Sequence, residues 1–494
     1  MKIIIIGGGF AGLSASLMLA RAGHQILVLE RDRLEPGADV EAAAASAFRT
    51  TAPQIVQPHI VNPKCRELLL QRLPDVYREL CAAGAVEAPL SAQMPPSLVD
   101  TAPRPGDERL SLLKIRRSTI DWVLLRTVLA EPGVTLRCGV RVTGLLSAAG
   151  EPPHVTGVRT EQDDHVTDLV IDAAGRGSAI DRWLGEIGAR PAAAYAAECG
   201  LAYFSRHYQM RPGIEAPEVP TRMLASLDEF TLLVSGADNG KVQLAVVPLA
   251  RDRRFRALKY PEVFAAVVRT VPAYAAWLDR LEPISPVFAM GAVRNTLRRL
   301  VVNGAPVVTG LHAIGDSVCT TNPSPGRGLS LALLAAADLL DTIELHVTDR
   351  IAQAFELDRL VGDHIAPFYE DQVTIDGARL AMLQHAIFNA PAPKVPVIFD
   401  RIDYAQLRTA ALFDPTAFRA LLNVAGMICW PNDVYTDPRM VARIRQVLDQ
   451  HDGGPPMVQP SREQLLAALA TGDLRRKGGN NEIRPQATSD RAGI

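Results

Sequence analysis

A strand, a glycine-rich turn and a helix at the start of the chain constrain this fold more than any other feature. Residues 2–6 form an almost wholly apolar, β-branched run, which is typical of a strand buried on both faces of a parallel sheet. Gly7, Gly9 and Gly12 follow at the spacing G-x-G-x-x-G, and residues 14–22 have the pattern of a helix. The segment therefore predicts the first part of a dinucleotide-binding βαβ unit.

Each glycine of this turn has its own physical role. Gly7 permits the tight turn, Gly9 lets the backbone approach a pyrophosphate, and Gly12 lets the helix pack closely on the strand. The N–H groups and positive dipole end of the helix favour phosphate. A glycine-rich turn of an ordinary α/β protein is the alternative, but the second strand and the acid that follow it in register favour the cofactor site.

The second strand of the unit, residues 25–29, ends at an acidic residue. Glu30 stands where a carboxylate accepts hydrogen bonds from the ribose of a dinucleotide. These features do not decide between NAD and FAD. The cofactor-binding residues predicted in this part of the chain are Gly7, Gly9, Ala11, Gly12, Glu30 and Arg31.

Composition excludes several classes of function. The 494 residues include 52 Lys plus Arg and 54 Asp plus Glu, so the chain has no global charge that favours nucleic acid or anionic membrane. The six cysteines are scattered without a CxxC pair, and no metal-ligand spacing stands out. No apolar run approaches the roughly 18 residues of a transmembrane helix. Gly7 breaks the first apolar run and no basic n-region precedes it, so we expect a cytoplasmic protein.

Two later segments resemble motifs of the p-hydroxybenzoate-hydroxylase-like (group A) FAD-dependent monooxygenases. Residues 168–178, which include Asp172-Ala-Ala-Gly175, resemble the "DG" motif of that family, and Arg182 follows as it does there. Residues 313–317, Ala-Ile-Gly-Asp-Ser, resemble the "GD" motif. The resemblance covers residues 1 to about 345.

The resemblance implies FAD as the cofactor and assigns roles to individual residues. Asp316 corresponds to the ligand of the ribityl or ribose group, and Arg117 to an arginine that contacts FAD, with Arg116 as the alternative. The loop at the flavin pyrimidine edge corresponds to Pro323, Gly326, Arg327 and Gly328. Taken singly, Asp172 is also compatible with a plain strand end, and Asp316 with a helix N-cap.

The amino-acid sequence of residues 319–328 most resembles that of actinobacterial tailoring oxygenases, including olefin epoxidases of polyether pathways. Ala174 departs from the family, where many relatives have Asp, and this puts the usual contacts of the DG motif in doubt. The Trp-x-Trp-x-Ile-Pro motif of flavin halogenases is absent, and the four tryptophans of the chain are isolated.

The function implied is oxygen insertion. NAD(P)H, or a separate flavin reductase, would reduce FAD; O₂ would then form a C4a-hydroperoxide, which would epoxidise or hydroxylate an apolar secondary metabolite. The weak catalytic candidates are His59 and Arg327, and the lack of a clear base favours epoxidation. Alternatives are a reductase or dehydrogenase of the geranylgeranyl-reductase type, a non-catalytic flavin-binding protein and, least favoured, a halogenase. Cys319, inside the GD loop, is expected to be a packing residue.

The predicted architecture is α/β. A discontinuous, Rossmann-like FAD-binding domain comprises residues 1–88, 106–186 and 285–348. A β-sheet substrate domain comprises 187–284, a helical C-terminal region 349–450, and residues 451–494 are expected to be a disordered tail. The side chains predicted to form the wall of the substrate site are Phe204, Phe230, Leu232 and Leu244, and the pattern predicts no oligomeric state.

Overall fold

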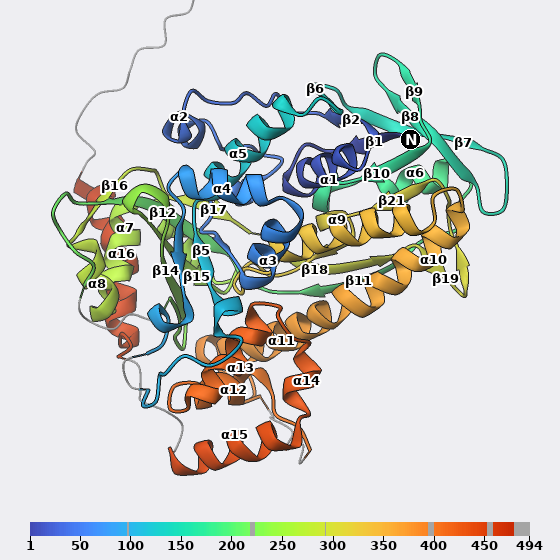
Figure 1. Ribbon diagram of the computed structural model, residues 1–494. Helices are drawn as coiled ribbons and strands as arrows, with labels where there is room; N and C mark the ends of the chain where they lie inside the picture. The colour runs from blue at the N-terminus through green and yellow to red at the C-terminus, as the bar shows by residue number, and fades with distance from the viewer. Residues whose placement is uncertain (96–97, 218–222, 292, 394–399, 452–457, 479–494) are drawn as a thin grey trace, which may run out of the picture.

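A five-stranded parallel sheet is the centre of the computed structural model (Figure 1). The structure describes residues 1–95, 98–217, 223–291, 293–393, 400–451 and 458–478. In spatial order the strands of this sheet are β21 (Leu311–Ala313), β10 (Leu169–Asp172), β1 (Lys2–Ile6), β2 (Gln25–Glu30) and β6 (Val134–Cys138). The predicted fold class is confirmed.

Strand β1 is buried on both faces because its isoleucines alternate between two cores. Ile3 and Ile5 pack in the core formed with α1 (Phe10–Arg21), α5 (Arg117–Ala130) and α9 (Gly328–Leu345). Ile4 and Ile6 face Trp183 and the antiparallel strands β7 (Val142–Ala148), β8 (His154–Thr160) and β9 (Asp164–Val166). A four-isoleucine run is therefore the pattern that this position requires.

A second, antiparallel sheet has the order β13-β14-β15-β12-β16, with β17 also paired to β12. Its strands are β12 (Tyr203–Met210), β13 (Leu224–Ser226), β14 (Phe230–Gly236), β15 (Lys241–Pro248), β16 (Leu281–Pro283) and β17 (Phe288–Met290). One face packs against α7 (Pro261–Arg269), α8 (Pro272–Leu278) and α16 (Arg462–Gly478). The other face is turned toward the N-terminal part of the chain.

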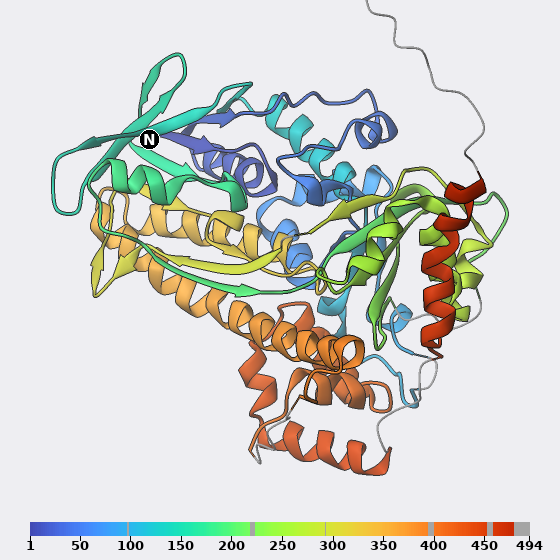
Figure 2. The same cartoon turned by 180° about the vertical axis from the view of Figure 1, so that it is seen from behind.

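Long antiparallel strands and helices join the two sheets (Figure 2). Strand β18 (Arg294–Arg299) pairs with β11 (Ala193–Glu198) and β22 (Cys319–Thr320). The C-terminal region is helical: α10 (Arg350–Leu360) and α11 (Ala366–Phe388) are joined by a π-helical turn, and α12 (Tyr404–Ala410), α13 (Pro415–Ala425), α14 (Pro431–Tyr435) and α15 (Pro438–Gln450) follow. The other elements are α2 (Val40–Ala45), α3 (Pro63–Arg72), α4 (Pro74–Ala82), α6 (Ile180–Glu186), β3 (Ile60–Val61), β4 (Val86–Ala88), β5 (Leu112–Lys114), β19 (Val301–Val302) and β20 (Ala305–Pro306).

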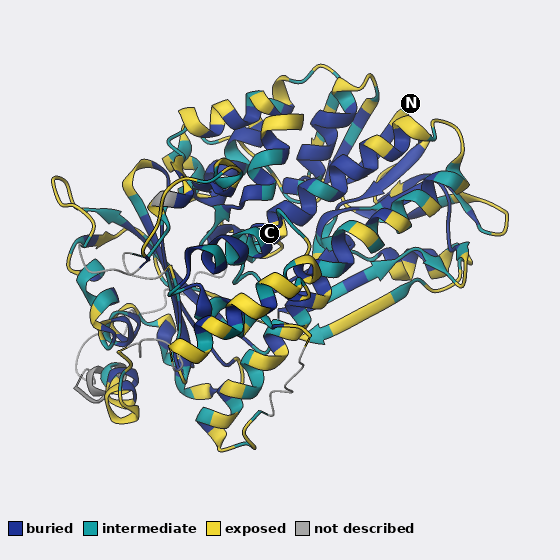
Figure 3. Ribbon diagram, turned by 60° about the horizontal axis from the view of Figure 1, so that its bottom comes forward, coloured by how far each residue is buried: buried dark blue, intermediate teal, exposed yellow. Residues whose placement is uncertain are grey.

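The strands of the central sheet are largely buried, whereas the helices around it are exposed on their outer faces (Figure 3). No helix among the described residues is both long and apolar enough to cross a membrane.

The prediction of a disordered tail at 451–494 is wrong for residues 462–478, which form α16. Leu465, Ala468 and Leu469 of this helix are buried in the core between the second sheet and α7. Three buried apolar residues on one helical face are enough to dock this segment. Residues 452–457 and 479–494 lie outside the described part. Residues 36–53, which are rich in Ala, Gly and Pro, contain the short helix α2.

The docking of α16 predicts a clear asymmetry between two adjacent leucines. Leu465 is 2% exposed and Leu466 is 41% exposed. We expect Leu465→Ala to destabilise the protein by about 2–5 kcal/mol through loss of burial and a residual cavity. The matched variant Leu466→Ala should change stability by no more than about 0.5 kcal/mol. Chemical denaturation measures both, and equal effects would show that α16 does not dock as described.

Candidate cofactor site

An open cavity lies at the carboxyl ends of the parallel strands. This is the edge at which open α/β sheets bind their ligands. The loops that follow β1, β2, β10 and β21 all reach it. The predicted residues that line it are Gly7, Gly9, Ala11, Glu30, Arg31, Arg117, Asp316 and Gly328.

The three glycines of the turn have different surroundings. Gly7 has φ +107°, and a Cβ there would lie 2.5 Å from the carbonyl oxygen of Ala173. A Cβ on Gly12 would lie 2.0 Å from the carbonyl oxygen of Gly7, so the helix could not approach the turn with any larger residue. By contrast, a Cβ on Gly9 would meet nothing within 4 Å. Two glycines are therefore required by the fold, while Gly9 keeps space open in the cavity.

Glu30 is held by the turn that it faces. Its carboxylate accepts hydrogen bonds from the backbone N–H of Gly8 at 2.6 Å and of Asp32 at 2.8 Å. The carboxylate is therefore fixed at the cavity wall while its remaining lone pairs are open to a hydroxyl donor. The cavity is otherwise strongly cationic, which suits a pyrophosphate; its arginines are Arg31, Arg49, Arg117, Arg141, Arg176 and Arg182.

The DG-like and GD-like segments meet in this cavity. The backbone N–H of Gly175 donates to Oγ of Ser317 at 3.0 Å, which ties the two loops together. Asp316 lines the cavity, and no described residue donates a hydrogen bond to its carboxylate. Burial raises the pKa of Asp316, while the cationic Arg117 and Arg176 act in the opposite direction. A half-buried carboxylate with no protein partner is the acceptor that a ribityl or ribose hydroxyl would satisfy.

Of the two adjacent arginines, Arg117 reaches the cavity and Arg116 does not. The guanidinium of Arg117 donates through Nε to Asp121 at 2.7 Å and lies over the ring of Phe10. Arg116 is buried and donates to Asp238 at 2.6 Å and to Glu41 at 2.9 Å. Arg116 therefore fixes the second sheet to α5, and Arg117 is the residue available to a ligand.

The loop that contains Pro323 and Gly326 is clamped on two sides. On one side, Nδ2 of Asn62 donates to the carbonyl oxygens of Pro325 at 3.2 Å and Gly326 at 3.0 Å. On the other side, Asp376 of α11 accepts from Nδ2 of Asn322 at 2.6 Å. Burial raises the pKa of Asp376, and hydrogen bonds from amide side chains partly oppose this. Gly326 has φ +72°, which favours glycine, and neither Gly326 nor Pro323 is among the residues that line the cavity.

The prediction that the side chain of Arg327 acts in catalysis is not supported by its position. Arg327 is fully buried, donates to Asp371 at 2.7 Å and lies over the ring of Phe368. Its guanidinium therefore points to α11, away from the cavity. A buried, paired arginine at the start of α9 fixes this helix to the C-terminal region.

His59 lies near Arg117, which lines the cavity, but it is not itself a lining residue. Its backbone is held by Gln243 of β15, and its Nδ1 lies 2.8 Å from the carbonyl oxygen of Gln57. Burial, and secondarily Arg117, lowers the pKa of His59 to about 4. Cys319 is buried in the main core, where it packs as a small apolar residue.

The side chains predicted to form the wall of the substrate site point away from the cavity. Phe204, Phe230, Leu232 and Leu244 all lie in the core that the second sheet shares with α7, α8 and α16. Strand alternation was assigned to the opposite face, because the sequence alone does not show which face of a sheet its helices cover. The face toward the cavity instead carries Tyr203, Ser205, His207, Ser235 and Gln243.

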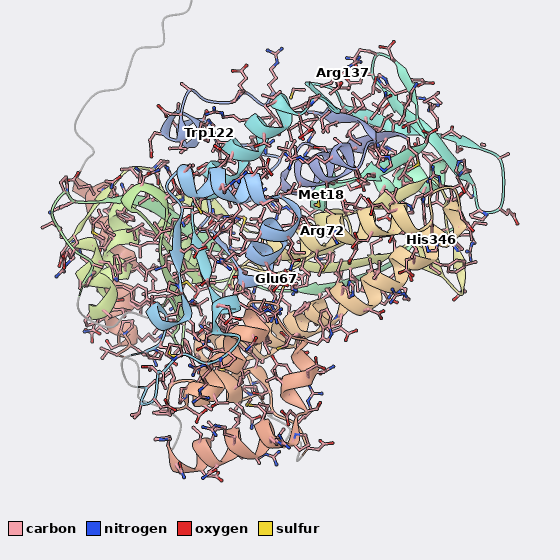
Figure 4. The ribbon with its side chains drawn as sticks, viewed as in Figure 1. Met18, Glu67, Arg72, Trp122, Arg137 and His346 are labelled. Carbon is pink, nitrogen blue, oxygen red and sulfur yellow. The ribbon has the colours of Figure 1, made fainter. Side chains whose placement is uncertain are left out.

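The loop after β2 also lines the cavity, which the sequence analysis missed. It is tied to α5 by Trp122, labelled in Figure 4, whose Nε1 donates to the carbonyl oxygen of Gly37 at 2.9 Å. The loop then returns along the cavity, where Arg49 lies 3.5 Å from Asp32. No motif marks these residues, since an irregular loop has no periodicity. The cavity residues missed in this region are Asp32, Arg49, Thr51 and Ala52.

Comparison with known proteins is consistent with a flavin site. Residues 2–98 match the family model DAO, FAD dependent oxidoreductase. Over 359 residues the chain is 25% identical to Protein Rv3254 of Mycobacterium tuberculosis, which covers 68% of this chain and 71% of that protein. A shorter stretch of 47 residues is 49% identical to a D-amino acid dehydrogenase of Methylobacterium radiotolerans, covering 10% of each.

Several solved structures have a similar fold. PqsL of Pseudomonas aeruginosa, described as a probable FAD-dependent monooxygenase, aligns with TM-score 0.55 and 17% identity over 79% of this chain and 100% of its own. The flavin-dependent brominase Bmp2 aligns with TM-score 0.59 and 15% identity over 92% and 99%. CtdE, solved with FAD and a substrate, aligns with TM-score 0.55 and 16% identity over 87% and 99%. These likenesses show that the chain has the fold of flavin-dependent enzymes.

The open space at Gly9 predicts a selective loss of cofactor. Gly9→Val adds a branched side chain to the cavity without meeting protein atoms, so FAD binding should be abolished while the melting temperature of the apoprotein is unchanged. Gly185→Val is the matched control, because Gly185 is exposed in α6 and a Cβ there also meets nothing within 4 Å. A Gly9→Val protein that still takes up FAD would contradict the site.

The unpartnered carboxylate of Asp316 predicts a different signature. A hydrogen bond to a charged group contributes roughly 1.5–3 kcal/mol, so Asp316→Ala should weaken FAD about tenfold to a hundredfold. No described residue donates a hydrogen bond to this carboxylate, so its removal leaves no donor without a partner and the apoprotein should not lose stability.

Asp172→Ala provides the contrast. Asp172 accepts from the N–H of Ala174 at 3.0 Å and from Oγ of Ser178 at 2.5 Å, so its removal should lower the melting temperature of the apoprotein. Equal apoprotein destabilisation in the two variants would mean that Asp316 is structural. Fluorescence titration with FAD and thermal denaturation give both quantities.

Proposed function

We propose that this chain is an FAD-dependent monooxygenase, of the p-hydroxybenzoate-hydroxylase-like type, that transfers one oxygen atom from O₂ to a small organic substrate. The observation that carries the proposal is the convergence of the glycine turn, the fixed carboxylate of Glu30 and the unpartnered carboxylate of Asp316 on one cationic cavity. The fold shared with PqsL and CtdE supports the same reading.

The residues present fit FAD along the whole cavity. Glu30 would hold the adenosine ribose, the N-terminus of α1 at Gly9 the pyrophosphate, and Asp316 the ribityl chain. The N-terminus of α9 at Gly328 and the guanidinium of Arg117 would provide positive potential at the flavin end. Bound FAD, reduced by NAD(P)H or by a separate reductase, would supply the activation of O₂.

The protein must then shield the reacting groups from water and orient the substrate. Gln54 and Arg117 line the part of the cavity that is nearest to His59. The backbone of His59 is in turn held by Gln243, on the face of β12 and β15 that carries polar side chains. The apolar side chains expected to form the wall of the substrate site lie on the opposite face of this sheet. His59 is too weakly basic, with a pKa of about 4, to remove the proton of a phenol. The proposal therefore covers epoxidation and hydroxylation alike.

A single nucleotide-binding sheet is present among the described residues, because the second sheet is antiparallel. Nicotinamide would thus bind transiently near the flavin or act through another protein. A reductase or dehydrogenase is the second candidate, and the match of residues 2–98 to the wider FAD dependent oxidoreductase model is the observation that favours it.

Reaction of the reduced protein with O₂ separates the two candidates. We expect FAD-loaded protein, reduced anaerobically and mixed with O₂, to return to its oxidised spectrum in two resolved phases. With 2-aminobenzoylacetate, the ligand of PqsL, as the first of a panel of aromatic probes, ¹⁸O from ¹⁸O₂ should enter the product. Turnover that continues without O₂, or label that comes only from water, would favour the reductase. Incorporation of bromide would indicate a halogenase.

A further inference from the structure

A row of buried polar residues crosses the second sheet on its cavity side. Ser235 of β14, Gln243 of β15 and His207 of β12 are directly paired in the strand register. Gln243 is fully buried, and His207 is 9% exposed. Burying polar groups in the middle of a sheet costs free energy unless they are hydrogen-bonded. The hydrogen-bond partners of these polar residues therefore indicate the role of this face of the sheet.

Gln243 is satisfied by a segment of the N-terminal half of the chain. Its Nε2 donates to the carbonyl oxygen of His59 at 3.1 Å, and its Oε1 accepts from the N–H of His59 at 3.2 Å. This double contact fixes residues 57–59 over the polar row. Ile60, which follows, lies against Gly326 of the loop that enters α9. His59 also lies close enough to His207 and to Arg117, which lines the cavity, to interact electrostatically with both.

Several polar atoms of Gln57, His59 and His207 have no partner in the described part of the chain. Three of them are buried: Nε2 of His207 and both amide atoms of Gln57, whose residue is only 3% exposed. The fourth is Nε2 of the half-buried His59. Because an unpaired buried polar atom is costly, three such atoms on neighbouring residues call for an explanation.

The protonation of His59 follows from its one ring contact. A carbonyl oxygen only accepts hydrogen bonds, so Nδ1 carries the hydrogen that it donates to Gln57. Burial lowers the pKa of His59 and of His207 to about 4, and both rings are therefore neutral at pH 7. His59 consequently presents a bare Nε2 lone pair, which requires a donor.

We infer that Gln57, His59 and His207 form a recognition site for a neutral substrate group that both donates and accepts hydrogen bonds, such as the lactam of a heteroaromatic ring. The N–H of such a group would donate a hydrogen bond to Nε2 of His59. Its carbonyl oxygen would accept a hydrogen bond from the side-chain amide of Gln57. A carboxylate is disfavoured as the ligand, because the lone pairs of its oxygens would face the lone pair of His59 Nε2. This inference rests on the proposed function, since it assumes that the substrate lies at the flavin end of the cavity.

Binding of matched probes to the FAD-loaded protein tests the inference. The probes are 2-quinolone, its N-methyl derivative, naphthalene and quinoline-2-carboxylate, and perturbation of the flavin absorbance reports their affinity. We expect 2-quinolone to bind at least tenfold more tightly than each of the others. In Gln57→Leu and His207→Phe the preference should fall to within about threefold. A wild-type protein that binds naphthalene or the carboxylate as well as 2-quinolone would overturn the inference.

A stability measurement separates recognition from a structural role. Gln57→Leu replaces unpartnered amide atoms with an apolar side chain, so the melting temperature should stay the same or rise. The matched control is Gln93→Leu, because Gln93 donates to the carbonyl oxygens of Ala88 at 2.9 Å and Leu110 at 3.0 Å. This control should lower the melting temperature and keep the probe preference. A Gln57→Leu protein that melts lower and keeps its preference would show that Gln57 is structural.

The inference and the proposed function fail in different ways. Selective binding of 2-quinolone by a protein that never transfers oxygen would overturn the proposed function and support the recognition site. Oxygen transfer without any preference for 2-quinolone would overturn the recognition site alone.

Discussion

The close approach of helix α1 to the first turn is the constraint on which the rest of the site depends. A Cβ on Gly12 would lie 2.0 Å from the carbonyl oxygen of Gly7, so only a glycine allows the helix to begin where it does. This position directs the N–H groups of the first helical turn at the cavity. It also leaves room for Glu30 to accept a hydrogen bond from Gly8, which fixes the acid at the cavity wall. Backbone packing and a binding surface thus arise from the same contact.

The flavin end of the cavity is fixed from a distance by the C-terminal helices. Asp376 and Asp371 both lie on α11, where they hold Asn322 and Arg327 on either side of the loop that enters α9. Both contacts are buried, and removing one partner of a buried pair costs several kcal/mol. The helical region therefore determines the shape of the loop that enters α9, although none of its described residues lines the cavity.

The sequence predicted those parts of the structure whose physical requirements are local. The glycine spacing, the isoleucine run and the acid at Glu30 each follow from a short-range constraint, and the fold class was correct. The paired motifs around Asp172 and Asp316 were identified by resemblance, and the structure brings them together at Gly175 and Ser317. The choice between Arg116 and Arg117 needed coordinates, because adjacent residues at the start of a helix point in different directions.

The parts that could not be predicted depend on tertiary contacts. The face of the second sheet that carries Phe230 and Leu232 was expected to line the substrate site. It is instead covered by helices that include α16, which lies far along the chain. The side chain of Arg327 was assigned to the cofactor by resemblance, and its actual partner, Asp371, lies on a helix that the local sequence does not indicate. His207 carries no motif, and both His207 and Gln57 become notable because their side chains have buried polar atoms without partners among the described residues.

The central claim is that the cavity at the carboxyl ends of the parallel strands binds FAD without a covalent bond. Purified protein, incubated with excess FAD and freed of unbound flavin, should release one FAD per chain when it is denatured by heat. Identification of the released flavin by chromatography and its quantitation against protein concentration make the measurement direct. Protein that takes up no FAD, or that retains another nucleotide in its place, would contradict the account.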